Sequence, residues 1–226
     1  MQKNLKAAIL AALMLAPAVS FAQDAEESNF SWNAGVVSDY VFRGVTQSNR
    51  EVAFQAGVDY AFGDSGFYAG AWGSNVNFGA GGPEIEVDLY AGYNADLGEK
   101  FNLDVMLTRY TYHGDDIGSP SSDYNELITK LALKDVATLT VGYTNNYGNA
   151  DIKSTYVNIG HDWDLGNDYT LNAGFGRTYT DFGDANDWTV GVTKSIKGIE
   201  FGLNYYDTNL DFRASDSVVL SIKVGG

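Results

Sequence analysis

Apolar and polar residues alternate along most of this chain, in segments of roughly ten residues separated by short polar stretches. The segment from Val52 to Phe62, for example, places six apolar side chains on one face, and Gln55, Gly57 and Asp59 on the other. A period of two residues predicts strands with one face against apolar surroundings. Twelve such strands are predicted, at residues 30–43, 52–62, 67–78, 84–94, 100–112, 123–133, 137–146, 153–163, 169–179, 187–196, 199–207 and 216–224.

The connections between these segments alternate between two kinds. Compact turns of Gly, Asp and Asn stand at 62–66, 96–99, 134–135, 164–168 and 197–198. The other connections are on the whole longer, at 44–51, 79–83, 113–122, 147–152, 180–186 and 208–215. Short turns on one side, longer loops on the other and an even strand number are typical of bacterial outer-membrane barrels. The chain is therefore predicted to be all-β, a single antiparallel up-and-down transmembrane barrel over residues 23–226.

The first residues predict export. Lys3 and Lys6 precede an apolar run from Ala7 to Leu15, which is followed by Pro17 and by Ser20-Phe21-Ala22. This order predicts a signal peptide over residues 1–22, because the run is too short to span a bilayer and a small-residue cleavage site follows it. The expected location is the outer membrane of the cell, reached with the barrel-assembly machinery.

The faces predicted to point outward carry aliphatic residues at mid-strand and aromatic residues near both ends. Such girdles are expected where strands cross a membrane interface, whereas a soluble β-sandwich would gather its aromatics in one core. The aromatics expected at the turn ends are Phe30, Trp32, Phe62, Tyr68, Tyr93, Phe101, Trp163, Tyr169 and Phe201. Those expected at the loop ends are Tyr40, Phe42, Phe54, Phe78, Tyr143, Tyr179, Trp188 and Tyr205.

The opposite faces carry more acids than bases. The acids with inward parity are Asp39, Asp59, Glu84, Glu86, Asp88, Asp104, Glu126, Asp162 and Glu200, and the bases are Arg43, Lys130 and Lys223. Unpaired carboxylates are costly to keep ionised away from water, so this excess indicates a wet lumen that favours cations. The alternative is a plugged lumen in which the same groups form a polar core. Twelve strands lie between filled eight-strand barrels and open porins, so the pattern leaves both interpretations open.

Other kinds of chemistry find little support. The formal net charge of −15 argues against a nucleic-acid partner. The sequence has no cysteine and no pair of histidines at the spacing of metal ligands, so neither a metal site nor a cofactor is expected. The two histidines, His113 and His161, are predicted at opposite ends of the barrel, so an enzyme is not expected. Arg109 and Arg177 have outward parity near the loops, where guanidinium groups can bind the phosphates of lipopolysaccharide or simply extend to the interface.

Three stretches resemble a known bacterial family. They are Ser38-Asp39-Tyr40-Val41-Phe42-Arg43-Gly44-Val45-Thr46-Gln47-Ser48, Glu86-Val87-Asp88-Leu89-Tyr90-Ala91-Gly92-Tyr93 and Tyr124-Asn125-Glu126. The family is labelled Gcw_chp and is also called the TorF family. The resemblance covers essentially the whole mature chain, and it implies a signal peptide, an outer-membrane barrel and a porin-like role, with no substrate or catalytic residue. Asp39 and Arg43 share an inward face, as do Glu86 and Asp88, so the four are expected to form either a charge network across the lumen or a structural lock that fixes strand register.

The leading hypothesis is a porin-like channel through which small hydrophilic solutes diffuse, with a preference for cations or weak selectivity. The residues expected to line the path are Asp39, Arg43, Asp59, Glu84, Glu86, Asp88, Asp104, Glu126 and Lys130. The alternative hypothesis is a non-conducting structural or adhesion barrel, whose loops contact lipopolysaccharide or an external partner. An outer-membrane hydrolase ranks third.

Overall fold

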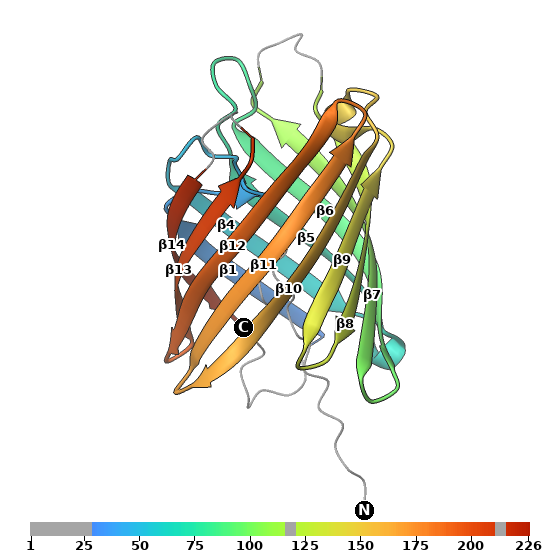
Figure 1. Cartoon of the computed structure of the whole chain (residues 1–226), viewed down its shortest axis with the longest axis vertical. Coiled ribbons are helices and arrows are strands. Elements are labelled where there is room, and N and C mark those ends of the chain that lie inside the picture. Colours follow the sequence, from blue (N-terminus) through green and yellow to red (C-terminus); the bar gives the residue numbers. More distant parts are fainter. Residues whose placement is uncertain (1–28, 116–120, 211–215) are drawn as a thin grey trace, which may run out of the picture.

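Twelve long strands close into a single antiparallel barrel, in which each strand pairs with its neighbours in the chain and β14 pairs back with β1 (Figure 1). The computed structural model describes residues 29–115, 121–210 and 216–226, so the predicted signal peptide at 1–22 lies outside the described residues. The fold class and the number of strands predicted from the sequence are confirmed. The barrel strands are β1 Phe30–Val37, β4 Ala53–Ala61, β5 Phe67–Asn75, β6 Ile85–Leu97, β7 Phe101–His113, β8 Tyr124–Leu133, β9 Ala137–Thr144, β10 Ser154–Gly166, β11 Tyr169–Thr180, β12 Gly183–Ile196, β13 Ile199–Thr208 and β14 Asp216–Gly225.

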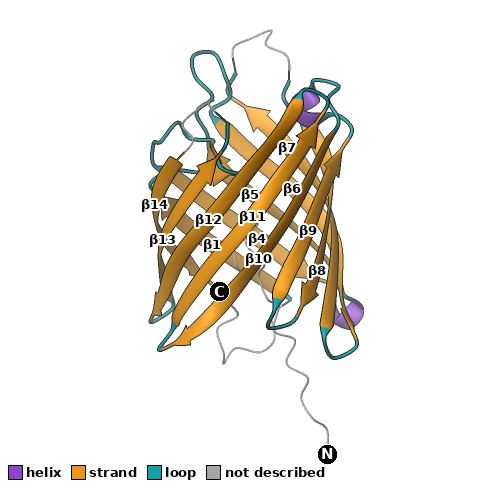
Figure 2. Ribbon diagram, viewed as in Figure 1, coloured by secondary structure: helices purple, strands orange, loops and turns teal. Residues whose placement is uncertain are grey.

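The two ends of the barrel differ in their connections (Figure 2). At one end, here the turn end, strands are joined by tight turns such as Lys197-Gly198, where φ is 52° and 80°. Two consecutive positive φ angles make a type I′ turn, whose twist matches that of the strands it joins. The opposite end, here the loop end, carries the longer connections, and among them is a short 3-10 helix η2 at Tyr147–Asn149. A second one, η1 at Gly63–Ser65, lies in a turn.

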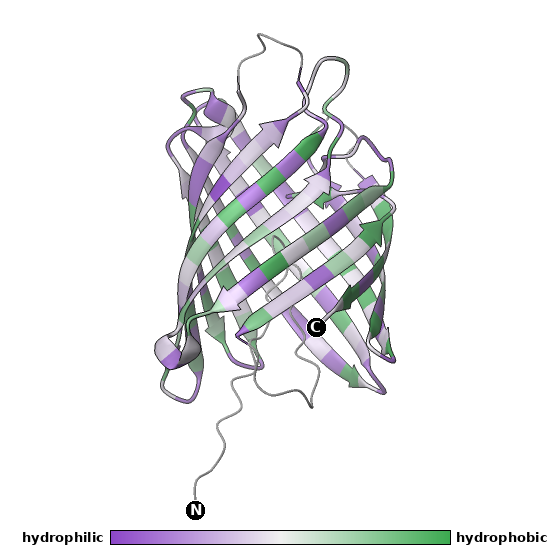
Figure 3. Cartoon of the chain, turned by 180° about the vertical axis from the view of Figure 1, so that it is seen from behind, coloured by the Kyte–Doolittle hydropathy of each residue, from purple (hydrophilic) through white to green (hydrophobic). Residues whose placement is uncertain are grey.

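Hydrophobic and hydrophilic residues alternate along the barrel strands (Figure 3), and many large apolar side chains are exposed. Aliphatic side chains such as Leu89, Leu107 and Ile159 are more than half exposed in mid-strand. Leaving a side chain of this size in water forgoes roughly 1.5–3 kcal/mol of burial energy, so a continuous band of them requires an apolar solvent. Exposed aromatics such as Trp32 and Trp163 stand near the turn end, as predicted for a girdle. Within the described ranges, no helix has the length and apolarity needed to span a membrane.

Several local predictions were wrong. The first strand ends at Val37 rather than at residue 43, because the chain then turns into a small hairpin, β2 Val41–Phe42 and β3 Val45–Thr46. The loop predicted from 180 to 186 is a two-residue turn, since β11 and β12 stay paired up to Thr180 and Gly183. Tyr68 points inward, where its hydroxyl donates to Asp104. Among the loop-end aromatics, Tyr40, Phe42 and Phe78 belong to or pack against an internal apolar cluster.

Candidate functional site in the barrel lumen

A hairpin that follows β1 enters the lumen from the loop end. This lumen hairpin comprises residues 38–48 and contains β2 and β3, in which Val41 pairs with Thr46 and Phe42 with Val45. Its tip is Arg43-Gly44, with φ angles of 49° and 76°. These angles again define a type I′ turn, which reverses the chain within two residues. The hairpin coincides with the longest stretch that resembles the Gcw_chp family.

Asp39 fixes the base of the hairpin. Its Oδ1 accepts a hydrogen bond from the Thr46 hydroxyl at 2.5 Å, and its Oδ2 accepts one from the Ser217 hydroxyl of β14 at 2.7 Å. The Tyr40 N–H donates to the Ser48 hydroxyl at 2.9 Å, which ties the two arms together. Hydrogen bonds to an ionised acceptor are stronger than those between neutral groups. Asp39 therefore joins the hairpin firmly to the barrel wall.

Apolar contacts hold one side of the hairpin against the wall. Tyr40 and Phe42 belong to a buried cluster, and the Tyr40 ring meets the Trp72 ring edge-on with centroids 5.5 Å apart. The wall contributes to this cluster from β5, β6, β7, β8 and β14, with Trp72, Tyr90, Met106, Ile128 and Val219. Buried aromatic pairs of this geometry add about 0.5–1.5 kcal/mol beyond area burial. The part of the lumen nearer the loop end thus contains a small hydrophobic core of its own.

Arg43 carries the tip of the hairpin to a different part of the wall. Its Nη2 donates to both oxygens of Glu126 on β8, at 2.9 and 2.8 Å. Its guanidinium carbon lies 4.1 Å from the centre of the Tyr156 ring on β10. The exposed fraction of Arg43 is 8 % and that of Glu126 is 1 %, so the ion pair is shielded from water. Removing one partner of such a pair typically costs about 3–5 kcal/mol, because the other charge is left buried alone.

Further hydrogen bonds orient the residues of the barrel wall that contact Arg43. The Tyr110 hydroxyl on β7 donates to Glu126 at 3.1 Å, and the Tyr156 hydroxyl donates to Asp187 on β12 at 3.1 Å. We call Glu126, Tyr156 and Asp187 the tip pocket, since they surround the Arg43 side chain and the hairpin turn. Asp187 is absent from the residues predicted to line the path, because the alternating pattern places it at the very start of a strand. Its parity with Thr189 and Gly191 is the signal that could have found it.

Glycines leave the space that the tip pocket needs. A Cβ atom on Gly142 of β9 would lie 2.8 Å from Glu126 Oε1 and 2.9 Å from Arg43 Nη2. A Cβ atom on Gly176 of β11 would lie 2.5 Å from Asp187 Oδ2. The two glycines pair directly with Tyr156 and Asp187 in the sheet. Large polar residues on β8, β10 and β12 therefore alternate with glycines on β9 and β11.

Glu86 and Asp88 are buried in the half of the lumen nearer the loop end, here the loop half. Arg43 does not pair with either of them. Glu86 Oε1 accepts a hydrogen bond from the Tyr112 hydroxyl at 2.9 Å. Glu86 Oε2 and Asp88 Oδ1 have no hydrogen-bond partner among the described residues. The ion pair that Arg43 makes is with Glu126, because the hairpin leaves the line of β1 and crosses the lumen. Glu84 precedes β6 and is exposed at the loop end.

The other half of the lumen, nearer the turn end, is here called the turn half. Its inward charged groups are more exposed to solvent than those of the loop half. Asp59 accepts a hydrogen bond from the Tyr90 hydroxyl at 2.6 Å, and Asp104 accepts one from Tyr68 at 2.9 Å. Lys130 stands opposite Asp104 in the register of β7 and β8. The partly exposed charged groups of this half are Asp59, Asp104, Asp162 and Glu200, with Lys130 and Lys223. Four acids against two bases leave an acidic excess there.

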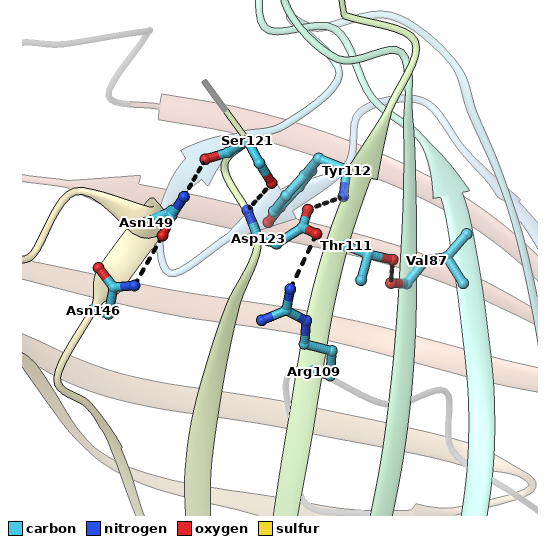
Figure 4. A network of polar contacts seen from close by, with 8 residues as sticks. All are labelled: Val87, Arg109, Thr111, Tyr112, Ser121, Asp123, Asn146 and Asn149. Carbon is cyan, nitrogen blue, oxygen red and sulfur yellow. Dashed lines mark hydrogen bonds and ion pairs between the residues drawn. The ribbon is translucent and has the colours of Figure 1, made fainter. Parts of the chain in front are cut away.

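The two outward arginines are engaged in ion pairs near the loop end. Arg109 on β7 bonds to Asp123 at 3.1 Å, and Asp123 also accepts the Tyr112 N–H (Figure 4). Arg177 on β11 bonds to Asp184 at 2.7 Å. Both arginine side chains remain about two-fifths exposed. The proposed contact with lipopolysaccharide would therefore have to share each guanidinium with a carboxylate.

The two histidines lie on different strands of the barrel. His113 is the last residue of β7 at the loop end, whereas His161 lies on β10 with its ring centre 4.7 Å from that of Trp163. In the described part of the chain, no three of the residue types His, Asp, Glu and Cys are grouped in a way that could hold a metal ion.

Comparisons with known proteins agree with the barrel. A solved structure described as "KdgM porin" matches with a TM-score of 0.54 and 11 % identity, covering 86 % of this chain and 97 % of that one. Another, described as "KdgM porin in complex with disordered oligogalacturonate", has a TM-score of 0.50 and 10 % identity, covering 87 % and 95 %. No curated protein matches the sequence. A family model described as "Bacterial protein of unknown function (Gcw_chp)" matches residues 22–223, so the chain belongs to the Gcw_chp family.

Proposed function

We propose that this protein is a porin-like channel of the bacterial outer membrane, with its narrowest section at the lumen hairpin. The observation that carries the proposal is the acidic, partly exposed inner wall of the turn half, formed by Asp59, Asp104, Asp162 and Glu200. Charged groups that keep solvent contact inside a barrel line a polar space, whereas a purely structural core would bury and pair them. The barrel likeness to KdgM porin supports the same interpretation at the level of the fold.

The solutes are small, hydrophilic, and neutral or cationic. Inside the barrel, acids outnumber bases in both halves, and a narrow acidic passage repels anions. Oligogalacturonate, which is present in one of the two KdgM porin structures, is a polyanion and does not suit this wall. The path runs from Asp104 and Lys130 toward Glu86, Asp88 and Glu126, and Arg43 narrows it.

In the conformation described here the hairpin packs against the inner wall of the loop half. The charged groups around it, Glu86, Asp88 and Glu126, are at most 5 % exposed. The channel proposal therefore has the hairpin move away from these groups during conduction. This same observation favours the second candidate, a non-conducting barrel in which the hairpin is a permanent structural core.

Single-channel recordings of the refolded full chain in planar bilayers separate the two candidates. The channel proposal expects discrete conductance steps and, under a salt gradient, a reversal potential of the sign that indicates cation preference. Changing Glu86→Gln and Asp88→Asn together should move that potential toward zero, because two acidic groups leave the path. Absence of steps in the wild type and in hairpin-release variants would rule the channel out in favour of the structural barrel.

A further inference from the structure

We infer that the tip pocket is a binding site for a guanidinium group on a permeating solute, and that Arg43 occupies this site while the hairpin is closed. The inference rests on the proposed channel function and assigns to it a class of solute. Three observations support it: how the pocket holds Arg43, which elements build the pocket, and how incompletely Arg43 is hydrogen-bonded there.

The contacts to Arg43 suit a planar cation. One carboxylate, Glu126, accepts two hydrogen bonds, and the Tyr156 ring faces the guanidinium carbon at 4.1 Å. A guanidinium group combines hydrogen bonding in its plane with stacking on its face, whereas an ammonium group is compact and more strongly hydrated. Asp187 adds a second negative charge held by the Tyr156 hydroxyl. Both hydrogen bonds to Glu126 come from one nitrogen, Nη2, so it is the stacking of the planar group on Tyr156 that favours guanidinium over a simple amine.

The pocket belongs to the wall and not to the hairpin. Glu126, Tyr156 and Asp187 come from β8, β10 and β12, and Tyr110 of β7 orients Glu126. Gly142 and Gly176 keep the space between them open. Since no hairpin residue is needed to assemble these groups, the pocket persists when the hairpin moves out. A solute that carries a guanidinium group can then take the position of Arg43.

Such a solute competes with the Arg43 side chain, which the hairpin holds beside the pocket. Two of the guanidinium nitrogens of Arg43, Nε and Nη1, have no hydrogen-bond partner among the described residues, so the hairpin satisfies its own cation incompletely. The apparent affinity for a free guanidinium is reduced by the fraction of time that Arg43 fills the pocket. Removing the Arg43 side chain should therefore tighten binding, which is opposite to the usual effect of deleting a contact residue.

The variant Arg43→Asn tests this point with the hairpin turn preserved. Asn-Gly is the preferred pair in type I′ turns, so Asn at φ 49° before Gly44 keeps the turn and empties the pocket. Methylguanidinium is the probe and methylammonium the comparison. Release of the hairpin is followed by acrylamide quenching of Trp72, which contacts Tyr40 and is 9 % exposed, with Trp72→Phe to identify its signal.

We expect methylguanidinium to raise both the conductance and the Trp72 quenching of the wild type, and to do so at concentrations at least about 5-fold below those of methylammonium. In Arg43→Asn it should instead reduce the current, with a half-effect at least about 5-fold lower than in the wild type. Adding Glu126→Gln to Arg43→Asn should weaken the effect of methylguanidinium about 10-fold or more. Asp184→Asn in the same background is the matched control, because it removes an exposed acid outside the lumen, the partner of Arg177, and should leave this affinity unchanged.

Equal half-effects in Arg43→Asn and Arg43→Asn/Glu126→Gln would overturn the site, as would equal action of the two probes. Tyr156→Leu gives a second test, since loss of the aromatic face should weaken methylguanidinium more than methylammonium. A channel that conducts but ignores methylguanidinium contradicts this inference alone. Trp72 quenching that depends on Glu126, without conductance in any variant, contradicts the channel proposal and leaves the binding site standing.

Discussion

The two halves of the lumen carry charges of the same kind but treat them differently. In the turn half, charged groups such as Asp104 and Lys130 keep partial contact with solvent. In the loop half, Glu86, Asp88, Glu126 and Asp187 are all buried, and the single base among the buried charged groups of the described residues, Arg43, lies on the lumen hairpin. The barrel strands run through both halves, whereas the eleven residues of the hairpin, 38–48, add a second layer of contacts in the loop half, such as that between Arg43 and Glu126.

The largest effect should come from removing the hairpin, which would make the loop half resemble the turn half. Replacing residues 40–47 by a Gly-Ser linker of equal length deletes Tyr40, Phe42 and Arg43 and leaves the wall intact. We expect single-channel conductance to rise by about 10-fold or more, because the residues that fill the loop half of the lumen are gone. The measurement is planar-bilayer recording. A variant that folds into lipid and conducts no better than the wild type would mean that the closure lies elsewhere.

A smaller change should loosen the tip without deleting it. Gly44→Ala puts a Cβ atom 2.8 Å from Thr208 Cβ and 2.9 Å from both Asp187 Cβ and the Asp207 carbonyl oxygen, at a φ of 76°. These contacts are too short, so the tip must lift away from the wall. We expect conductance and acrylamide quenching of Trp72 to increase by roughly 2- to 5-fold, because the tip no longer packs against the wall.

Gly198→Ala is the matched control for that variant. Gly198 also has a positive φ, 80°, but a Cβ atom there meets nothing within 4 Å. Both substitutions therefore strain the backbone of a type I′ turn by about 1 kcal/mol, and they differ in the steric clash with the wall. If both variants open the channel equally, general destabilisation rather than the position of the hairpin would be the cause.

The alternating pattern is enough to predict the barrel but not the hairpin. Residues 30–43 keep the alternating pattern apart from Val37, Ser38 and Val41, and these isolated departures do not show that the strand stops at Val37. Asp39 and Arg43 have inward parity in a straight strand and also point into the lumen from the hairpin, although their partners differ. Arg43-Gly44 is the local turn signal, but it equally suits the start of an external loop. Whether a loop folds outward or inward depends on wall residues such as Glu126 and Trp72, which are far away in the sequence.

The aromatic side chains that point inward are a second feature that the alternating pattern does not predict. Tyr68 and Trp72 lie on the inner face of β5, where Gly70 and Gly92 leave room for neighbouring rings. The sequence pattern places Tyr68 in the outer girdle, because aromatics near strand ends usually face lipid. Its hydroxyl instead pairs with Asp104 across the sheet. The glycines opposite these rings are the sign that an aromatic points inward, and they become readable only once the register is known.

A third and smaller effect tests the turn half. Asp59→Asn and Asp104→Asn together remove two of its four acids, and we expect the cation-to-anion permeability ratio to fall by about 2-fold while conductance stays within about 30 %. Lys130→Gln should change selectivity in the opposite direction, because it removes a base that pairs in register with Asp104. Reversal potentials under a salt gradient provide the measurement. Selectivity that ignores all three changes would place the charge-sensing groups in the loop half alone.

The smallest effect is expected outside the lumen, at Arg109 and Arg177. Each guanidinium is partly exposed and already has a carboxylate partner, Asp123 or Asp184, so removing it should change the free energy of unfolding by only about 0–1 kcal/mol in phospholipid. If the same side chains also bind lipopolysaccharide phosphates, Arg109→Gln/Arg177→Gln should lose stability only when lipopolysaccharide is present. Urea unfolding in vesicles with and without lipopolysaccharide measures this difference, and Arg50→Gln, which breaks another exposed pair near the loops, is the control. An equal loss in both lipids would mean that the arginines stabilise the sheet through Asp123 and Asp184 and not through lipid.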